Sequence, residues 1–98
     1  MEVTQNDTEI ILKLESDLTG DTVEELRIEL LKSLEEQGSR VAVDLQKVEN
    51  IDSMGLAVLI AAKKTSKQKH IILTLTNINE DIHNLFQLVH LAGFFDLN

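Results

Sequence analysis

Ser53 is the residue whose type and position point most clearly to chemistry. It lies in the segment 51–56 (IDSMGL), directly before an apolar, alanine-rich stretch that ends at Ala62. A serine here is typical of a helix N-cap, because its hydroxyl can accept from the free backbone N–H groups of the first turn. The positive end of the helix dipole would also stabilise a phosphate. Gly55 removes a side chain where the first turn approaches a neighbouring strand or a partner.

The other residue types that catalysis needs are absent or isolated. The chain has no cysteine, which excludes a thiol nucleophile, a disulfide and a cysteine-ligated zinc ion. Its histidines, His70, His83 and His90, have no accompanying ligand pattern, so we expect no metal site. No histidine is paired in sequence with a serine that it could activate, and there is no glycine-rich phosphate loop. We therefore expect a binding protein without a cofactor, not an enzyme.

Length and composition predict one domain over residues 1–98. Hydrophobic residues make up 43% of the chain, which is enough for a core. The formal net charge of −8 argues against nucleic acid or an anionic membrane surface as the main partner. The longest apolar run, 55–62, is far too short to span a bilayer, so we expect no direct membrane insertion. The acidic, polar N-terminus predicts no signal peptide, and we expect a cytoplasmic protein.

The pattern of apolar residues predicts four strands. Residues 2–5 and 8–15 are expected to form a hairpin around an Asn-Asp turn. Alternating valines predict a half-buried strand over residues 40–45. Residues 70–75 form a dense run rich in β-branched residues, which is typical of a buried strand.

Three helices are expected between and after these strands. The first begins with a capping box of Asp21 and Glu24 and ends at Gly38, and the third begins at Asn79 and ends at Gly93. The stripes that these two helices would bury are Val23, Leu26, Leu30 and Leu34 in the first, and Ile82, Leu85, Phe86 and Val89 in the third.

The remaining helix is expected from Ser53 to about Ser66. The end of this helix carries a cluster of lysines, which we interpret as solvated because cations suit the negative end of the helix dipole. The cluster consists of Lys63, Lys64, Lys67 and Lys69. Strands that alternate with helices after a starting hairpin predict an α/β layer fold.

The segments 41–45 (VAVDL) and 51–56 (IDSMGL) together resemble the STAS domain of bacterial anti-sigma factor antagonists. The resemblance implies a mixed β-sheet of about four to five strands with helices mainly on one face. In that family a partner kinase phosphorylates the serine that follows the aspartate, and this position corresponds to Ser53. Residues 14–26 resemble the family's loop and helix start, although Thr19 stands where the family usually has an aspartate near the serine.

The resemblance implies a regulatory module that binds a partner serine kinase, or anti-sigma factor, of the ATP-binding histidine-kinase-like type. Phosphorylation of Ser53 by this kinase would end the contact, and a serine phosphatase would restore it. From the local sequence alone, an unmodified N-cap serine is the commoner interpretation. Asp52 is either a second cap or turn residue, or one that positions the hydroxyl or helps to bind the partner. The expected partner-binding residues are Thr19, Asp21, Thr22, Asp52, Ser53, Met54, Gly55 and Leu56.

Two other functions remain open for a domain of this family. One is a STAS subunit of a lipid-transport ABC system, which would bind its ATPase constitutively and need no phosphorylated serine. The other is a STAS domain that binds a small molecule or nucleotide, or that serves as a stressosome-like scaffold. The sequence does not separate these functions from the phosphorylation-controlled module.

Overall fold

The computed structural model describes residues 1–35 and 40–97, and these ranges hold four strands and three helices. In chain order the elements are β1 (Glu2–Gln5), β2 (Glu9–Lys13), α1 (Asp21–Ser33), β3 (Arg40–Asp44), α2 (Ser53–Gln68), β4 (Ile72–Thr76) and α3 (Glu80–Leu88). The strands form one sheet in the order β1-β2-β3-β4, with β1 and β2 antiparallel and the other neighbours parallel. The predicted α/β class, the hairpin and the mixed sheet are confirmed.

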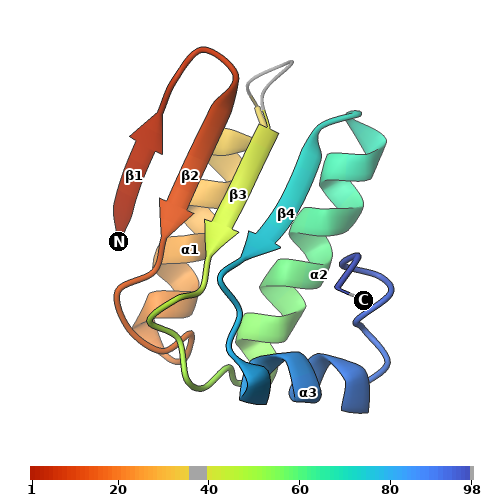
Figure 1. Cartoon of the computed structure of the whole chain (residues 1–98). Helices are drawn as coiled ribbons and strands as arrows, with labels where there is room; N and C mark the ends of the chain where they lie inside the picture. The colour runs from red at the N-terminus through yellow and green to blue at the C-terminus, as the bar shows by residue number, and fades with distance from the viewer. Residues whose placement is uncertain (36–39, 98) are drawn as a thin grey trace.

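Helices α1 and α2 cover one face of the sheet (Figure 1). Each helix joins two neighbouring parallel strands, α1 between β2 and β3 and α2 between β3 and β4. Such crossovers are almost always right-handed, so two that advance in the same direction along a sheet place their helices on the same face. Helix α3 follows β4 and lies at the end of the sheet where β3 and β4 finish (Figure 1). The prediction of helices mainly on one face is therefore confirmed.

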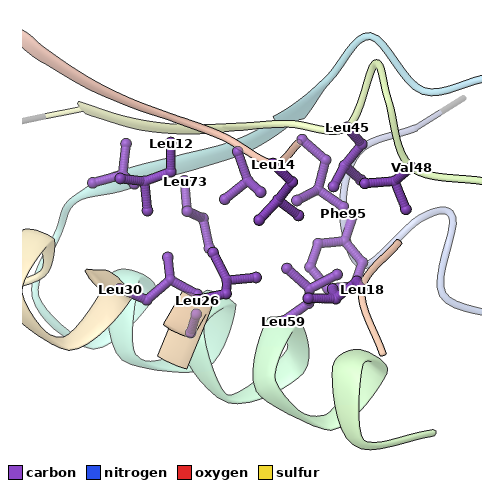
Figure 2. Close-up of a cluster of buried hydrophobic side chains, with 14 of the residues drawn as sticks. Leu12, Leu14, Leu18, Leu26, Leu30, Leu45, Val48, Leu59, Leu73 and Phe95 are labelled. Carbon is purple, nitrogen blue, oxygen red and sulfur yellow. The ribbon is translucent and has the colours of Figure 1, made fainter. Parts of the chain in front are cut away.

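The hydrophobic core lies between the sheet and the two covering helices (Figure 2). The strand residues that face the helices pair in two rows: Ile10, Val41 and Leu73, then Leu12, Val43 and Leu75. Leu26 of α1 and Leu59 of α2 are completely buried against these rows. Phe86 of α3 and Phe95 close the core at the C-terminal end, with ring centroids 5.3 Å apart. The C-terminal segment is thus anchored by aromatic packing.

The capping box predicted for α1 is not formed. The N-cap residue is Gly20, whose φ of 57° is in the left-handed region that glycine adopts without strain, and no side chain caps the helix. Asp21 is instead the first helical residue, and its carboxylate is exposed at the positive end of the helix dipole. Helix α1 ends at Ser33, whereas the predicted stop at Gly38 lies outside the described residues.

Helix α3 begins as predicted but ends earlier. The Asn79 side chain accepts a hydrogen bond from the Ile82 backbone N–H at 2.8 Å, so the predicted cap is confirmed. The predicted stop at Gly93 is wrong, because the helix ends at Leu88 and His90 takes the left-handed conformation, with a φ of 62°. Histidine is among the non-glycine residues that tolerate this conformation, so a glycine was not needed here.

Helix α2 and the following strand are displaced slightly along the chain from the prediction. The helix continues past Ser66 to Gln68, and β4 begins at Ile72. His70 lies in the turn between them, again with a left-handed φ, of 59°. The predicted stripe of α3 includes Val89, which is 39% exposed and lies beyond the helix.

Lys63 corrects the interpretation of the lysine cluster. Lys64, Lys67 and Lys69 are exposed, although Lys69 Nζ donates to the Leu34 carbonyl and Lys67 Nζ lies over the Phe94 ring, whereas Lys63 is buried. Its Nζ donates to the Leu73 carbonyl at 2.8 Å and lies 3.4 Å from Asp96 Oδ2. Leu73 belongs to the edge strand β4, and its carbonyl would otherwise be left without a donor in a buried place. The aliphatic stem of the lysine packs on the core while its ammonium group donates a hydrogen bond to the Leu73 carbonyl of the strand.

Replacement of Lys63 by methionine should destabilise the fold, because the buried Leu73 carbonyl loses its donor. We expect a loss of about 1–3 kcal/mol in the free energy of unfolding, measured by urea titration. The control is Asp96→Asn, since this carboxylate is exposed and its contact is long, and it should change stability by less than about 0.5 kcal/mol. Equal losses in the two variants would show that the ion pair, not the strand contact, stabilises this edge.

Candidate functional site

The candidate site is the N-terminal turn of α2, where Asp52 and not Ser53 is the cap. Asp52 Oδ1 accepts from the Gly55 backbone N–H at 2.7 Å, and the Asp52 carbonyl accepts from the Leu56 N–H at 3.0 Å. The prediction of a Ser53 cap is therefore wrong. Ser53 is the first helical residue and is exposed, so its hydroxyl takes no part in the cap. A modifying enzyme could reach this hydroxyl without breaking the turn that presents it.

A second contact of Asp52 fastens the loop before α1 to the start of α2. Its Oδ2 accepts from the Gly20 N–H at 3.3 Å. Leu18, in the same loop, forms a parallel bridge with Ile51: its N–H donates to the Asn50 carbonyl and its carbonyl accepts from the Asp52 N–H. Leu18 is completely buried and belongs to the core cluster (Figure 2). Two loops far apart in sequence thus form one surface around Ser53.

Asp17 holds the same two loops together from the other side. Its Oδ1 accepts from the backbone N–H groups of Glu49 and Asn50 at 2.8 and 3.1 Å, and its Oδ2 accepts from Asn50 Nδ2 at 2.9 Å. The hydrogen bond from the Asn50 side chain, followed by those from the two backbone groups, lowers the pKa of Asp17. The sequence did not indicate this role, because the partners lie in a distant connector with no pattern of their own.

The structure brings the predicted partner-binding residues together but gives them different environments. The exposed members are Thr19, Asp21, Ser53 and Met54, and the half-buried members are Thr22, Asp52 and Leu56. Met54 is 64% exposed directly beside Ser53. Thr22 is occupied within its own loop, because its hydroxyl accepts from the Thr19 N–H and lies 2.6 Å from the Asp17 carbonyl. Their role in binding stays a prediction.

Gly55 differs from these residues because it is buried beneath the site. A Cβ on this residue would lie 2.8 Å from the Leu18 carbonyl oxygen, 2.9 Å from Leu18 Cγ and 3.0 Å from Ile51 Cγ2. These distances are shorter than ordinary van der Waals contacts, so the first turn of α2 can approach the Leu18–Ile51 bridge only with glycine at this position. The close approach that the sequence predicted here is made with the chain's own loop.

The titratable groups in the described part of the chain form no candidate metal site. Within residues 1–35 and 40–97, no group of three histidine, aspartate or glutamate side chains is placed to hold a metal ion. His83 Nε2 lies 2.6 Å from the Leu97 carbonyl oxygen and ties α3 to the C-terminal segment. His70 and His90 are exposed in turns after helices.

Comparison with known proteins identifies the family of this fold. The family model described as "Mlab, STAS domain" matches residues 1–97, so the chain belongs to the STAS domain family. The predicted resemblance is therefore confirmed at the level of the domain. None of the described helices is both long enough and apolar enough to cross a membrane.

Two solved structures share the fold at low sequence identity. A protein from Thermotoga maritima, described as a candidate anti-sigma factor antagonist, is 20% identical over 94% of this chain and 80% of its own, with a TM-score of 0.84. The Bacillus cell fate determinant SpoIIAA, solved in its phosphorylated form, is 14% identical over 96% of this chain and 86% of its own, with a TM-score of 0.75. These matches confirm the STAS-like arrangement of sheet and helices.

Gly55→Ala should destabilise the domain, because the added methyl group must displace the Leu18 backbone. We expect a loss of about 1–3 kcal/mol in unfolding free energy, the usual cost of over-packing. Gly93→Ala is the matched control: no described atom lies within 4 Å of its Cβ position, so the change should be within about 0.5 kcal/mol. A stable Gly55→Ala variant would mean that the two loops are not held this closely.

Asp17→Asn should reduce stability at neutral pH and change its dependence on pH. Because folding lowers the pKa of Asp17, its ionised form adds stability above the unfolded pKa of about 3.9. This contribution disappears as the pH falls through the lower folded pKa. Urea titrations should therefore show the wild-type advantage over Asp17→Asn at pH 7 shrinking below about pH 4. A wild-type advantage that stays the same between pH 7 and pH 3 would contradict this role of Asp17.

Proposed function

We propose that this protein is an anti-sigma factor antagonist-like regulator switched by phosphorylation of Ser53. In its unmodified state it binds a serine kinase, or anti-sigma factor, of the ATP-binding histidine-kinase-like type and withholds it from its target. The kinase uses ATP to phosphorylate Ser53, the contact weakens, and a serine phosphatase restores it. The observation that carries the proposal is the exposed hydroxyl of Ser53, which stands outside the cap on the first turn of α2 in a STAS domain. The match to SpoIIAA, a protein solved in its phosphorylated form, supports it.

A phosphate on Ser53 would change docking by electrostatics and not by unfolding. Phosphorylation adds about −1.5 to −2 charges at pH 7. The free N–H groups and dipole of α2 stabilise this charge locally, and the cap on Asp52 does not use the modified hydroxyl. A partner packed over Met54 would instead have to bury the phosphate or leave it unpaired, which is costly. The domain therefore keeps its structure while the complex dissociates.

The proposed docking surface consists of the exposed residues around this hydroxyl. It comprises Thr19 and Asp21 from the loop and first turn before α1, together with Ser53 and Met54 from α2. Asp52 and Gly55 act beneath it, since one caps the helix and the other permits the close loop contact. Met54 suits a docking role because its flexible thioether adapts to a partner surface. The protein would work as a cytoplasmic binding module, not an enzyme, with a protein and not nucleic acid as its partner.

The alternative is a STAS subunit of a lipid-transport ABC system that binds its ATPase constitutively. It is favoured by the name Mlab that the matching family model carries. The contact with the ATPase would then be permanent and would not depend on the charge at position 53, so Ser53 need not be phosphorylated. The two functions differ in whether a negative charge at position 53 is ever introduced.

Ser53 variants separate the two functions. Binding of wild type, Ser53→Ala and Ser53→Asp to the kinase or ATPase encoded beside this gene would be measured by calorimetry. Under the proposed function alanine preserves binding, while aspartate weakens it about tenfold or more, because a charge is placed against an interface that excludes water. Gln68→Glu is the matched control, since it adds one charge at the far, exposed end of the same helix.

The chemistry is checked by incubating wild type and Ser53→Ala with the kinase and ATP, followed by mass spectrometry of the peptide containing position 53. We expect one phosphate on wild type and none on the variant. Equal binding by alanine and aspartate variants, together with no phosphate on wild type, would favour the constitutive subunit.

A further inference from the structure

The outer edge of strand β1 differs from the outer edge of β4. The two strands lie at opposite edges of the sheet (Figure 1). Proteins often protect such edges with a lysine, a proline or a bulge, because unpaired backbone groups can accept a further strand. At the β4 edge, Lys63 donates to the Leu73 carbonyl. Strand β1, with the sequence EVTQ, contains neither lysine nor proline, and its register with β2 has no bulge.

The backbone of Val3 points to the outer edge of β1. The Asn6 N–H donates to the Glu9 carbonyl at 3.0 Å, and the hydrogen-bonded pairs of an antiparallel ladder alternate with pairs that are not bonded. The next bonded pair along the ladder is therefore Thr4 with Ile11. Val3 lies between bonded positions, so its N–H and C=O are directed away from β2, where they can pair with another strand.

The side chain of Val3 ends an apolar row that crosses the core-facing side of the sheet. The other members of the row are at most 7% exposed, and they are Leu12, Val43 and Leu75. Val3 is 47% exposed, and Ile28 of α1, which lines the same hollow, is 43% exposed. A strand added to this edge would extend the row and cover both side chains.

We propose that the added strand is β1 of a second copy of this chain, paired antiparallel about a two-fold axis at Val3. The N–H of each Val3 donates to the carbonyl of the other, so the two sheets become one. The two valine side chains lie opposite each other and continue the buried row into the second copy. Glu2 lies opposite Thr4 of the second copy, so the new ladder pairs no like charges.

The charges on α1 favour this antiparallel arrangement. Ile28 and Val3 line one hollow, so Ile28 lies near the proposed axis, and the axis makes the two α1 helices antiparallel. Glu25 comes three residues before Ile28 and Lys32 comes four residues after it, on the same face of the helix. The axis therefore places Glu25 of each copy near Lys32 of the other, whereas a parallel arrangement would place Glu25 against Glu25. Glu29, which also lines the hollow, is paired with Lys32 of its own helix at 3.8 Å.

Sedimentation equilibrium over a range of protein concentrations tests for the dimer. It would be measured in about 0.15 M salt, which screens the repulsion between two copies of net charge −8. We expect a reversible dimer that Val3→Lys weakens about tenfold or more, because a charge would be buried at the axis. Ile72→Lys is the matched control, since Ile72 is 50% exposed on the other edge strand, and it should leave the dimer unchanged. Protein that stays monomeric up to about 1 mM would overturn the proposal.

Charge exchange on α1 tests the arrangement of the two copies. Glu25→Lys reduces the net negative charge, so it would strengthen a dimer limited only by general repulsion. In the proposed dimer it places two lysines together and should weaken association about threefold or more. Lys32→Glu should also weaken association, and the double variant should restore the wild-type affinity. A stronger dimer in Glu25→Lys, or no restoration in the double variant, would overturn the antiparallel arrangement.

Amide hydrogen exchange tests whether β1 is the contact. The Val3 N–H should exchange slowly in the concentrated dimer and rapidly in the dilute monomer, while the N–H of Thr4, which faces β2, should change little. A dimer in which the Val3 N–H still exchanges rapidly would use another surface and would overturn the proposal. None of the residues assigned to the docking surface around Ser53 lies on β1. These measurements need no kinase, so their outcome is independent of the proposed function.

Discussion

Two carboxylates that join distant loops are the constraint on which the site depends. Asp17 accepts from the connector before α2, while Asp52 caps α2 and accepts from the loop before α1. Between them lies the Leu18–Ile51 bridge, in which Leu18 is buried in the core and Ile51 is partly buried, and Gly55 lets the helix approach it. Carboxylates that accept from several aligned N–H groups hold a loop more firmly than exposed ion pairs do. The fold thereby presents Ser53 on a rigid turn.

Under the proposed function, this arrangement lets one hydroxyl govern binding without governing stability. Ser53 sits in the first turn but outside the cap, so a group added to it leaves the Asp52 hydrogen bonds in place. The helix dipole moderates the added charge within the domain, whereas a partner surface has no such compensation.

The sheet and the helices were predictable from the sequence because their signals are local. The apolar stripes of the helices and the alternation of Val41 with Val43 indicate the faces that pack on one another, although Ala42, on the other face of β3, is buried as well. The choice between Asp52 and Ser53 as the cap was not predictable, because aspartate and serine cap equally well and the additional contact of Asp52 is with Gly20, far away in sequence. The burial of Lys63 was not predicted for the same reason. Its acceptor is the Leu73 carbonyl, and this carbonyl is free to accept only because β4 is an edge strand, which the local sequence does not reveal. The role of Asp17 likewise depends on the distant Asn50.

The most direct test of this account compares the amide NMR spectra of the unmodified protein and the protein phosphorylated at Ser53. If the loops hold a rigid site, shifts should be confined to residues 17–22 and 49–57, with the amides of β2, β3 and β4 unchanged and the Gly20 and Gly55 amides still protected from exchange. Shifts that spread through the sheet, or loss of protection at Gly55, would show that phosphorylation acts by unfolding the start of α2 and would contradict it.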